Sequence, residues 1–278
     1  MQSFNTAFSL GNVALSWNAI MLALGILTAV VVSGILVKKR KAYKDLALDA
    51  CIVGIPSGLF GARLFSAISG KIPFSHFFLI GENGLNLPGA LVFAGIAIAV
   101  YARIKKLRVA ETFDLLLPGA FFGLAVGRWS DFFLCEGLGP VVQNDAQKFF
   151  PLATFTPNYA HSGEVAYAVF FLDFLICIGL GILALILSKK LETGRTTRLC
   201  VILYLFAAFL LEWLREGSAR QLVFGGVRFN QIVLIVLLGF FIGLSLYRTK
   251  KPKQTGASKP EQPESEAPAN EEDGGDAA

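Results

Sequence analysis

Hydrophobic residues are gathered into about seven long runs, each close to the roughly 20 residues that a helix needs to cross a bilayer. The runs cover Trp17–Val37, Leu46–Ile68, Leu87–Ala102, Phe113–Leu134, Val165–Leu187, Leu199–Leu214 and Asn230–Tyr247. The third and sixth runs are the shortest. Polar segments separate all of them, so the pattern predicts an all-α polytopic bundle of about seven transmembrane helices over residues 1–249.

Basic residues follow every second run. Most of the 25 Lys and Arg residues lie in four segments, at 38–44, 103–108, 189–198 and 248–259. Basic loops remain on the cytoplasmic side of a membrane. The distribution therefore predicts an outside N-terminus and a cytoplasmic C-terminus. The net charge of +5 is then directed at the anionic inner membrane surface, and we expect no nucleic-acid partner.

The composition agrees with a membrane protein, because 54% of the residues are hydrophobic and only 16% are charged. Soluble domains carry about 25% charged residues. Cys51, Cys135, Cys177 and Cys200 lack the spacing of metal ligands or of a disulfide framework. We expect neither a metal site nor another cofactor.

The C-terminal segment, residues 250–278, differs from the rest of the chain. It is rich in Lys, Pro, Glu, Ser and Ala and contains no aromatic residue. Such a segment has too little apolar surface to offset the entropy lost on ordering. We expect a disordered cytoplasmic tail.

Several ionisable residues lie in or beside the hydrophobic runs. In the predicted orientation they share the outer half of the membrane: Arg63, Arg128, Asp131, Glu136, His161, Glu164, Glu212 and Arg215. A charge at the bilayer centre costs about 2.5–3.5 kcal/mol, so such groups usually face the bundle interior and serve a function. Their common depth predicts a polar site near the outer face. Asp173, in the middle of the fifth run, has no partner in this scheme.

A purely structural interpretation exists for each of these residues. Arg63 and Arg215 can extend to the headgroup level. Asp131 lies three residues after Arg128 and can neutralise it on the same helix face. His161 can cap a helix rather than exchange protons. The pattern leaves both interpretations open.

Residues 127–139, with the sequence GRWSDFFLCEGLG, resemble the characteristic motif of the prolipoprotein diacylglyceryl transferases. Matching positions are Gly127, Arg128, Phe132, Glu136 and Gly139, whereas Asp131 and Leu134 replace two asparagines of the family. Further resemblances follow in order at Gly61–Arg63, Asn83–Ala90, His161–Glu164, Tyr204, Glu212, Arg215 and Asn230–Gln231. Together they extend over most of the predicted membrane domain.

The resemblance implies a multi-pass enzyme of the bacterial inner membrane. Such an enzyme moves the diacylglyceryl group of phosphatidylglycerol to the lipobox cysteine thiol of a prolipoprotein signal peptide. A cationic site is needed for the departing phosphate, and a base for the thiol proton. The resemblance suggests Arg128 for phosphate contact, with Arg63 or Arg215 assisting, and His161, Glu136 or Glu164 as the base. Asp131, Tyr204 and Glu212 are expected to contact the substrates, which include membrane lipid.

The chain also departs from the family at residues thought to serve the chemistry. A family His aligns with Pro88, a family Arg with Ala208 and a family Tyr with Ala166. Three functions therefore remain compatible with the sequence. They are the family transferase, a catalytically degenerate relative that binds a lipid headgroup or lipidated peptide, and a membrane transporter.

Overall fold

The computed structural model describes residues 6–10, 13–70, 72–78, 85–155, 164–215, 223–224 and 227–250. Seven helices in this part of the chain are long and apolar enough to cross a membrane. They are α1 (Trp17–Lys39), α2 (Leu46–Ile68), α3 (Leu87–Ile104), α4 (Val109–Gly127) with its short continuation α5 (Trp129–Leu134), α6 (Val169–Lys190), α7 (Arg195–Leu214) and α8 (Phe229–Lys250). The prediction of an all-α, multi-pass bundle is confirmed.

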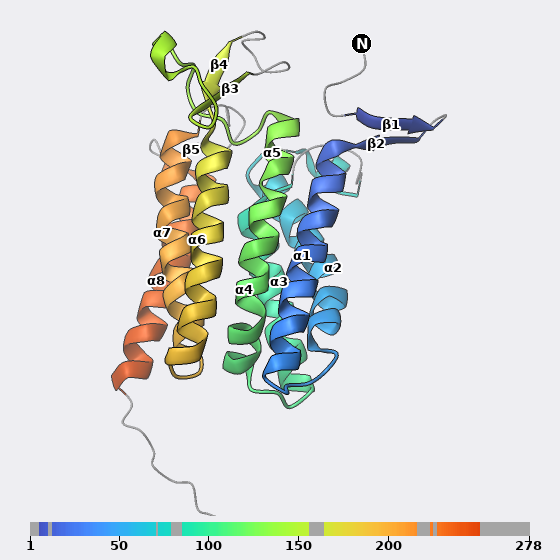
Figure 1. Ribbon diagram of the computed structural model, residues 1–278, viewed down its shortest axis with the longest axis vertical. Coiled ribbons are helices and arrows are strands. Elements are labelled where there is room, and N and C mark those ends of the chain that lie inside the picture. The colour runs from blue at the N-terminus through green and yellow to red at the C-terminus, as the bar shows by residue number, and fades with distance from the viewer. Residues whose placement is uncertain are drawn as a thin grey trace, which may run out of the picture.

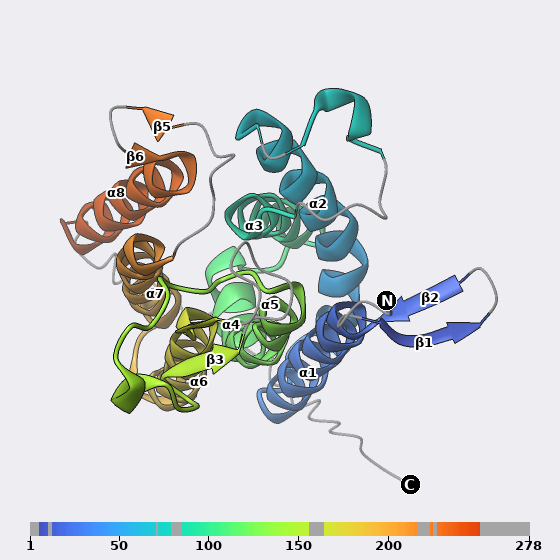
Figure 2. The ribbon, with the colours of Figure 1, turned by 90° about the horizontal axis from the view of Figure 1, so that it is seen from above.

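The helices run side by side along the long axis of the molecule (Figure 1). Seen from above, α4 lies near the middle, with α1, α2 and α3 on one side and α6, α7 and α8 on the other (Figure 2). The main helix contacts are α1 with α4, α2 with α3, and α4 with α6. Which end faces the cytoplasm remains a prediction from the basic loops. Residues 251–278, most of the predicted tail, lie outside the described residues.

Short antiparallel strand pairs lie at one end of the bundle (Figure 1). They are β1 (Thr6–Leu10) with β2 (Val13–Ser16), β3 (Ala153–Phe155) with β4 (Val165–Tyr167), and β5 (Val223–Phe224) with β6 (Val227–Arg228). Two short 3-10 turns, η1 (Phe74–His76) and η2 (Asp145–Gln147), complete the elements. The fifth hydrophobic run was expected to be helical from Val165, but its first residues form β4 and the helix begins at Val169.

Glycines allow the close approach of α2 to α3. A Cβ atom on Gly61 would lie 2.5 Å from the carbonyl oxygen of Gly89, and a Cβ atom on Gly89 would lie 2.5 Å from that of Gly61. Real Cβ atoms essentially never approach so closely, and small residues are the usual means by which membrane helices pack backbone to backbone. The Gly61-Ala62-Arg63 segment thus has a structural role at its first residue.

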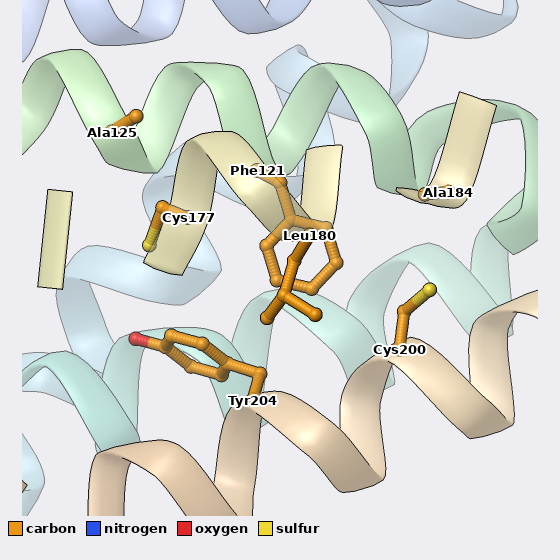
Figure 3. Packing of buried hydrophobic residues seen from close by; sticks show 7 residues of the cluster. All are labelled: Phe121, Ala125, Cys177, Leu180, Ala184, Cys200 and Tyr204. Atoms are coloured by element: carbon orange, nitrogen blue, oxygen red, sulfur yellow. The ribbon is translucent and has the colours of Figure 1, made fainter. Parts of the chain in front are cut away.

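A buried hydrophobic cluster joins α4, α6 and α7 (Figure 3). Its members are Phe121, Ala125, Cys177, Leu180, Ala184, Cys200 and Tyr204. The ring of Tyr204 packs edge-on against Phe121 with centroids 5.7 Å apart. Its hydroxyl is directed toward the Cys177 end of the cluster (Figure 3). This packing fixes the three helices that carry the polar site described next.

Candidate functional site

Arg128 lies at the junction of α4 and α5, with only 9% of its side chain exposed. Its Nη1 atom lies 3.1 Å from Oδ2 of Asp131, one turn along the chain. Its Nη2 atom lies 2.6 Å from Oδ2 of Asp173 on α6 and donates to the Tyr204 hydroxyl on α7 at 3.2 Å. The two ends of one guanidinium therefore contact groups from three helices.

A second arginine, Arg215, reaches the same carboxylate from the position directly after α7. Nη2 of Arg215 lies 2.7 Å from Oδ2 of Asp173, and Nη1 lies 3.5 Å from Oε2 of Glu212. Asp173 is only 1% exposed, and a single oxygen of its carboxylate accepts from both guanidinium groups. Charge-assisted bonds of this length are among the stronger polar contacts in proteins.

Asp173 is the important residue that the sequence pattern left without a partner. The pattern placed it in the middle of a run that began at Val165, far from the outer charges. Because α6 begins at Val169, Asp173 lies one turn inside the helix and at the level of Arg128. A lone Asp close to the start of a membrane helix would have indicated a residue at the depth of the outer charges. The helix start could not be recognised in the sequence, because the residues of β4 before it are also hydrophobic.

Amide groups extend the polar contacts to α3 and α8. The side-chain nitrogen of Asn230 donates to Oε1 of Glu212 at 3.3 Å, and that of Asn86 donates to Oδ1 of Asn230 at 2.7 Å. Asn86 also caps α3, because its side-chain oxygen accepts from the Gly89 N–H. The buried Glu212 is thus contacted directly from α8 and, through Asn230, indirectly from the start of α3.

Arg228, at the end of β6, secures the C-terminal end of α7. Its Nη1 atom donates to the carbonyl oxygens of Glu212 at 2.9 Å and of Arg215 at 2.6 Å. Carbonyl groups at the C-terminal end of a helix have no N–H partner within the helix, and basic side chains commonly donate to them. The contact fixes the backbone that presents Glu212 and Arg215.

A cavity of about 60 Å³ lies among these groups. Its lining combines the polar cluster with apolar residues of α3, α7 and α8: Leu87, Pro88, Leu91, Arg128, Asp173, Tyr204, Leu205, Ala208, Glu212, Arg215, Asn230, Leu234 and Leu237. The Nε atoms of Arg128 and Arg215 are buried and have no hydrogen-bond partner within the described residues. Two cationic side chains of the cavity wall therefore retain unused donors.

The structure brings together Arg128, Asp131, Tyr204, Glu212 and Arg215 from the expected site. Of these, Asp131 contacts Arg128 without lining the cavity.

The other four expected residues are placed differently. Arg63, on α2, is buried but does not line the cavity. Glu136 follows α5 and is half-buried, and Glu164 is exposed just before β4. Neither glutamate lines the cavity, and His161 lies outside the described residues.

Glycines after α5 set the path of the chain beside this cluster. Gly137 has φ of +68°, in the left-handed region that favours glycine. A Cβ atom on Gly139 would lie 3.0 Å from Cβ of Tyr167 and 3.1 Å from the Leu214 carbonyl oxygen. The last glycine of the motif therefore permits the loop to pass close to the end of α7.

Comparison with known proteins places the whole membrane domain in one family. The model of the prolipoprotein diacylglyceryl transferase family matches residues 5–247. Three relatives, each named phosphatidylglycerol–prolipoprotein diacylglyceryl transferase, are similar over most of both chains. The Clostridium kluyveri protein is 28% identical over 250 residues, which are 86% of this chain and 95% of the relative. The Clostridium botulinum protein is 27% identical over 256 residues (88% and 98%) and the Listeria innocua protein 26% over 251 residues (88% and 90%).

The family match spans all seven long helices and every residue that lines the cavity. The chain belongs to the prolipoprotein diacylglyceryl transferase family.

Proposed function

We propose that this multi-pass membrane protein transfers the diacylglyceryl group of phosphatidylglycerol to a cysteine thiol of a prolipoprotein. The observation that carries the proposal is the pairing of Arg128 and Arg215 on one cavity, in a chain that matches this family from residue 5 to residue 247. The names of the relatives supply the two substrates. The two guanidinium groups supply donors suited to the phosphate that departs.

In the proposed reaction the thiolate sulfur attacks the terminal glyceryl carbon that bears the phosphate ester. A carbon–sulfur bond forms, the carbon–oxygen bond breaks, and glycerol phosphate leaves with the bonding electrons. Arg128 and Arg215 would neutralise the charge that develops on the phosphate oxygens. The thiol proton passes to a base, for which His161, Glu136 and Glu164 are the candidates.

The remaining contacts would orient the substrates around this phosphate. The hydroxyl oxygen of Tyr204 accepts a hydrogen bond from Arg128, and its O–H group would donate to the bound substrate. Glu212, 5% exposed and bonded to Asn230, would accept from the glycerol hydroxyl groups of the headgroup. Asp131 would limit the rotation of Arg128, to which it is bonded.

We further propose that the protein resides in a bacterial inner membrane with the cavity toward the outer leaflet. The basic segments support this orientation, because they follow α1, α3 and α6 and include the last turn of α8, at the end of the bundle opposite to α5 and the strand pairs. Phosphatidylglycerol of the outer leaflet and the emerging signal peptide would then meet at the same depth. The acceptor would be the lipobox cysteine.

One experiment tests the transfer directly. Purified protein is incubated with phosphatidylglycerol labelled in its acyl chains and a peptide that contains a lipobox cysteine. We expect label in a thioether on the peptide and release of glycerol phosphate in equal amount. A matched peptide with serine at the acceptor position should receive none. Absence of thioether product from folded protein would refute the transfer.

A second function, binding of the lipid headgroup without transfer, is favoured by one specific observation. Pro88 and Ala208, the positions aligned with a family His and a family Arg, both line the cavity. Neither can exchange a proton or bind an anion. The same assay separates the two functions: a non-catalytic relative would retain phosphatidylglycerol during purification or titration but form no thioether.

A further inference from the structure

We propose that Asp173 occupies the position of the substrate phosphate between Arg128 and Arg215, and that the lipid displaces it on binding. This inference rests on the proposed function, because it concerns the same cavity. It adds a residue that sets the affinity and the charge selectivity of that cavity.

The geometry around Asp173 is that of an anion held between two guanidinium groups. One oxygen, Oδ2, lies 2.6 Å from Nη2 of Arg128 and 2.7 Å from Nη2 of Arg215. A phosphate oxygen requires the same arrangement of donors at the same distances. Its other oxygen, Oδ1, has a weak thiol donor, Sγ of Cys177 at 3.7 Å. The strong contacts of Asp173 are therefore those that a phosphate would replace.

The balance of charge favours this exchange. The carboxylates of Asp131, Asp173 and Glu212 face the guanidinium groups of Arg128 and Arg215, and the guanidinium group of Arg228 lies against the carbonyl oxygens of Glu212 and Arg215. An added phosphate would leave negative charge uncompensated in a buried site, which is costly. Asp131 and Glu212 each contact an arginine on their own chain segment, three residues away. Within the described residues, Asp173 alone bridges both arginines.

The place of Asp173 in the cavity wall leads to the same conclusion. Asp173 lines the cavity together with Arg128 and Arg215, so the position of its side chain decides which guanidinium donors face the cavity. Rotation of the Asp173 side chain away from the arginines would both enlarge the cavity and release the two donors. The Nε atoms of Arg128 and Arg215, which have no partner among the described residues, add two more donors for an anion.

The test measures lipid binding rather than turnover. The wild-type protein and Asp173→Asn are placed in discs of phosphatidylcholine, and phosphatidylglycerol is titrated in. The amide preserves the shape of the side chain but removes the charge that competes with the phosphate. We expect Asp173→Asn to bind phosphatidylglycerol about tenfold more tightly than the wild type, since a like charge within a few ångströms is removed. Titration with glycerol phosphate in solution shows whether the headgroup alone suffices.

Asp114→Asn is the matched control. Asp114, on α4, accepts hydrogen bonds from the Gly194 and Thr197 N–H groups, at the end of the bundle opposite to the cavity. We expect this substitution to leave phosphatidylglycerol affinity unchanged. Unchanged or weaker affinity of a folded Asp173→Asn protein, with normal binding by the wild type, would overturn the displacement while leaving the proposed function intact.

Two further results complete the test. If the wild type neither binds phosphatidylglycerol nor forms thioether, the proposed function fails and the displacement fails with it. If Asp173→Asn does not fold, the structure of the wild type bound to phosphatidylglycerol decides. We expect a phosphate oxygen between Arg128 and Arg215, with Asp173 beyond hydrogen-bond distance of both. Asp173 still bridging the arginines in that complex would overturn the proposal.

Discussion

Substitution of Arg128 by lysine separates a phosphate-binding role from a purely structural one. Arg128 contacts Asp131 through Nη1 and Asp173 and Tyr204 through Nη2. Lysine retains the positive charge but has a single nitrogen, which cannot occupy both ends of this fork. Arg128→Lys should therefore lose at least one charge-assisted hydrogen bond while the net charge of the site is unchanged.

The expected magnitude follows from that loss. One hydrogen bond to a charged group contributes about 1.5–3 kcal/mol. If the bond acts on the departing phosphate, kcat/KM for phosphatidylglycerol should fall roughly ten- to 150-fold. The free energy of unfolding should also fall, because one contact of Arg128 to Asp131, Asp173 or Tyr204 is lost, but by less than in Arg128→Ala. Arg128→Ala should also unfold more easily, by about 3–5 kcal/mol, since it leaves buried carboxylates without their cation.

The assay pairs thioether formation with thermal unfolding in the same detergent. Arg195→Lys is the matched control, because Arg195 begins α7 at the opposite end of the bundle and its side chain is 51% exposed. It should preserve both activity and stability. Full activity in Arg128→Lys would refute contact with the phosphate. Parallel loss of activity and stability in the lysine and alanine variants would show that Arg128 serves the fold alone.

Three further predictions concern the bundle. Gly61→Ala should lower the free energy of unfolding by about 1–3 kcal/mol, because its Cβ would lie 2.5 Å from the Gly89 carbonyl oxygen. The control is Gly95→Ala, whose Cβ would have no described atom within 4 Å. It should be neutral or slightly stabilising in the same thermal assay. A reporter fused after Lys106 should be cytoplasmic and one after Lys148 external; a cytoplasmic reading at Lys148 would refute the orientation. Truncation after Lys253 should preserve insertion and transfer, and loss of folded protein would refute a dispensable tail.

The fold was predictable from the sequence because a bilayer imposes a strong length requirement on apolar helices. All seven expected runs correspond to long helices. The residues at which the helices begin and end were harder to predict, since hydrophobic residues also occur in strands. The segment Val165–Tyr167 forms β4 and pairs with β3, although its composition suits a membrane helix equally well. That difference of one helical turn decided whether Asp173 could be placed in the site.

The polar cluster was predictable in part. Arg128 with Asp131 and Glu212 with Arg215 are each three residues apart, and local helix geometry brings such pairs together. Contacts between helices depend instead on helix rotation and depth, which a single sequence does not specify. The bridge from Arg128 through Asp173 to Arg215 is of this second kind. The lining of the cavity by Pro88 and Ala208 is also of this kind.

Pro88 illustrates how the fold and the chemistry of this chain are separable. It lies in the first turn of α3, where a backbone N–H has no partner within the helix, so proline is accepted without loss of a hydrogen bond. The neighbouring contacts that position α3 come from Gly89 against Gly61 and from the cap formed by Asn86. A family histidine at this position would therefore contribute to the cavity and not to the helix. Its replacement leaves the bundle intact while changing what the cavity wall can do, and the proton of the acceptor thiol must then be taken by another group of the site.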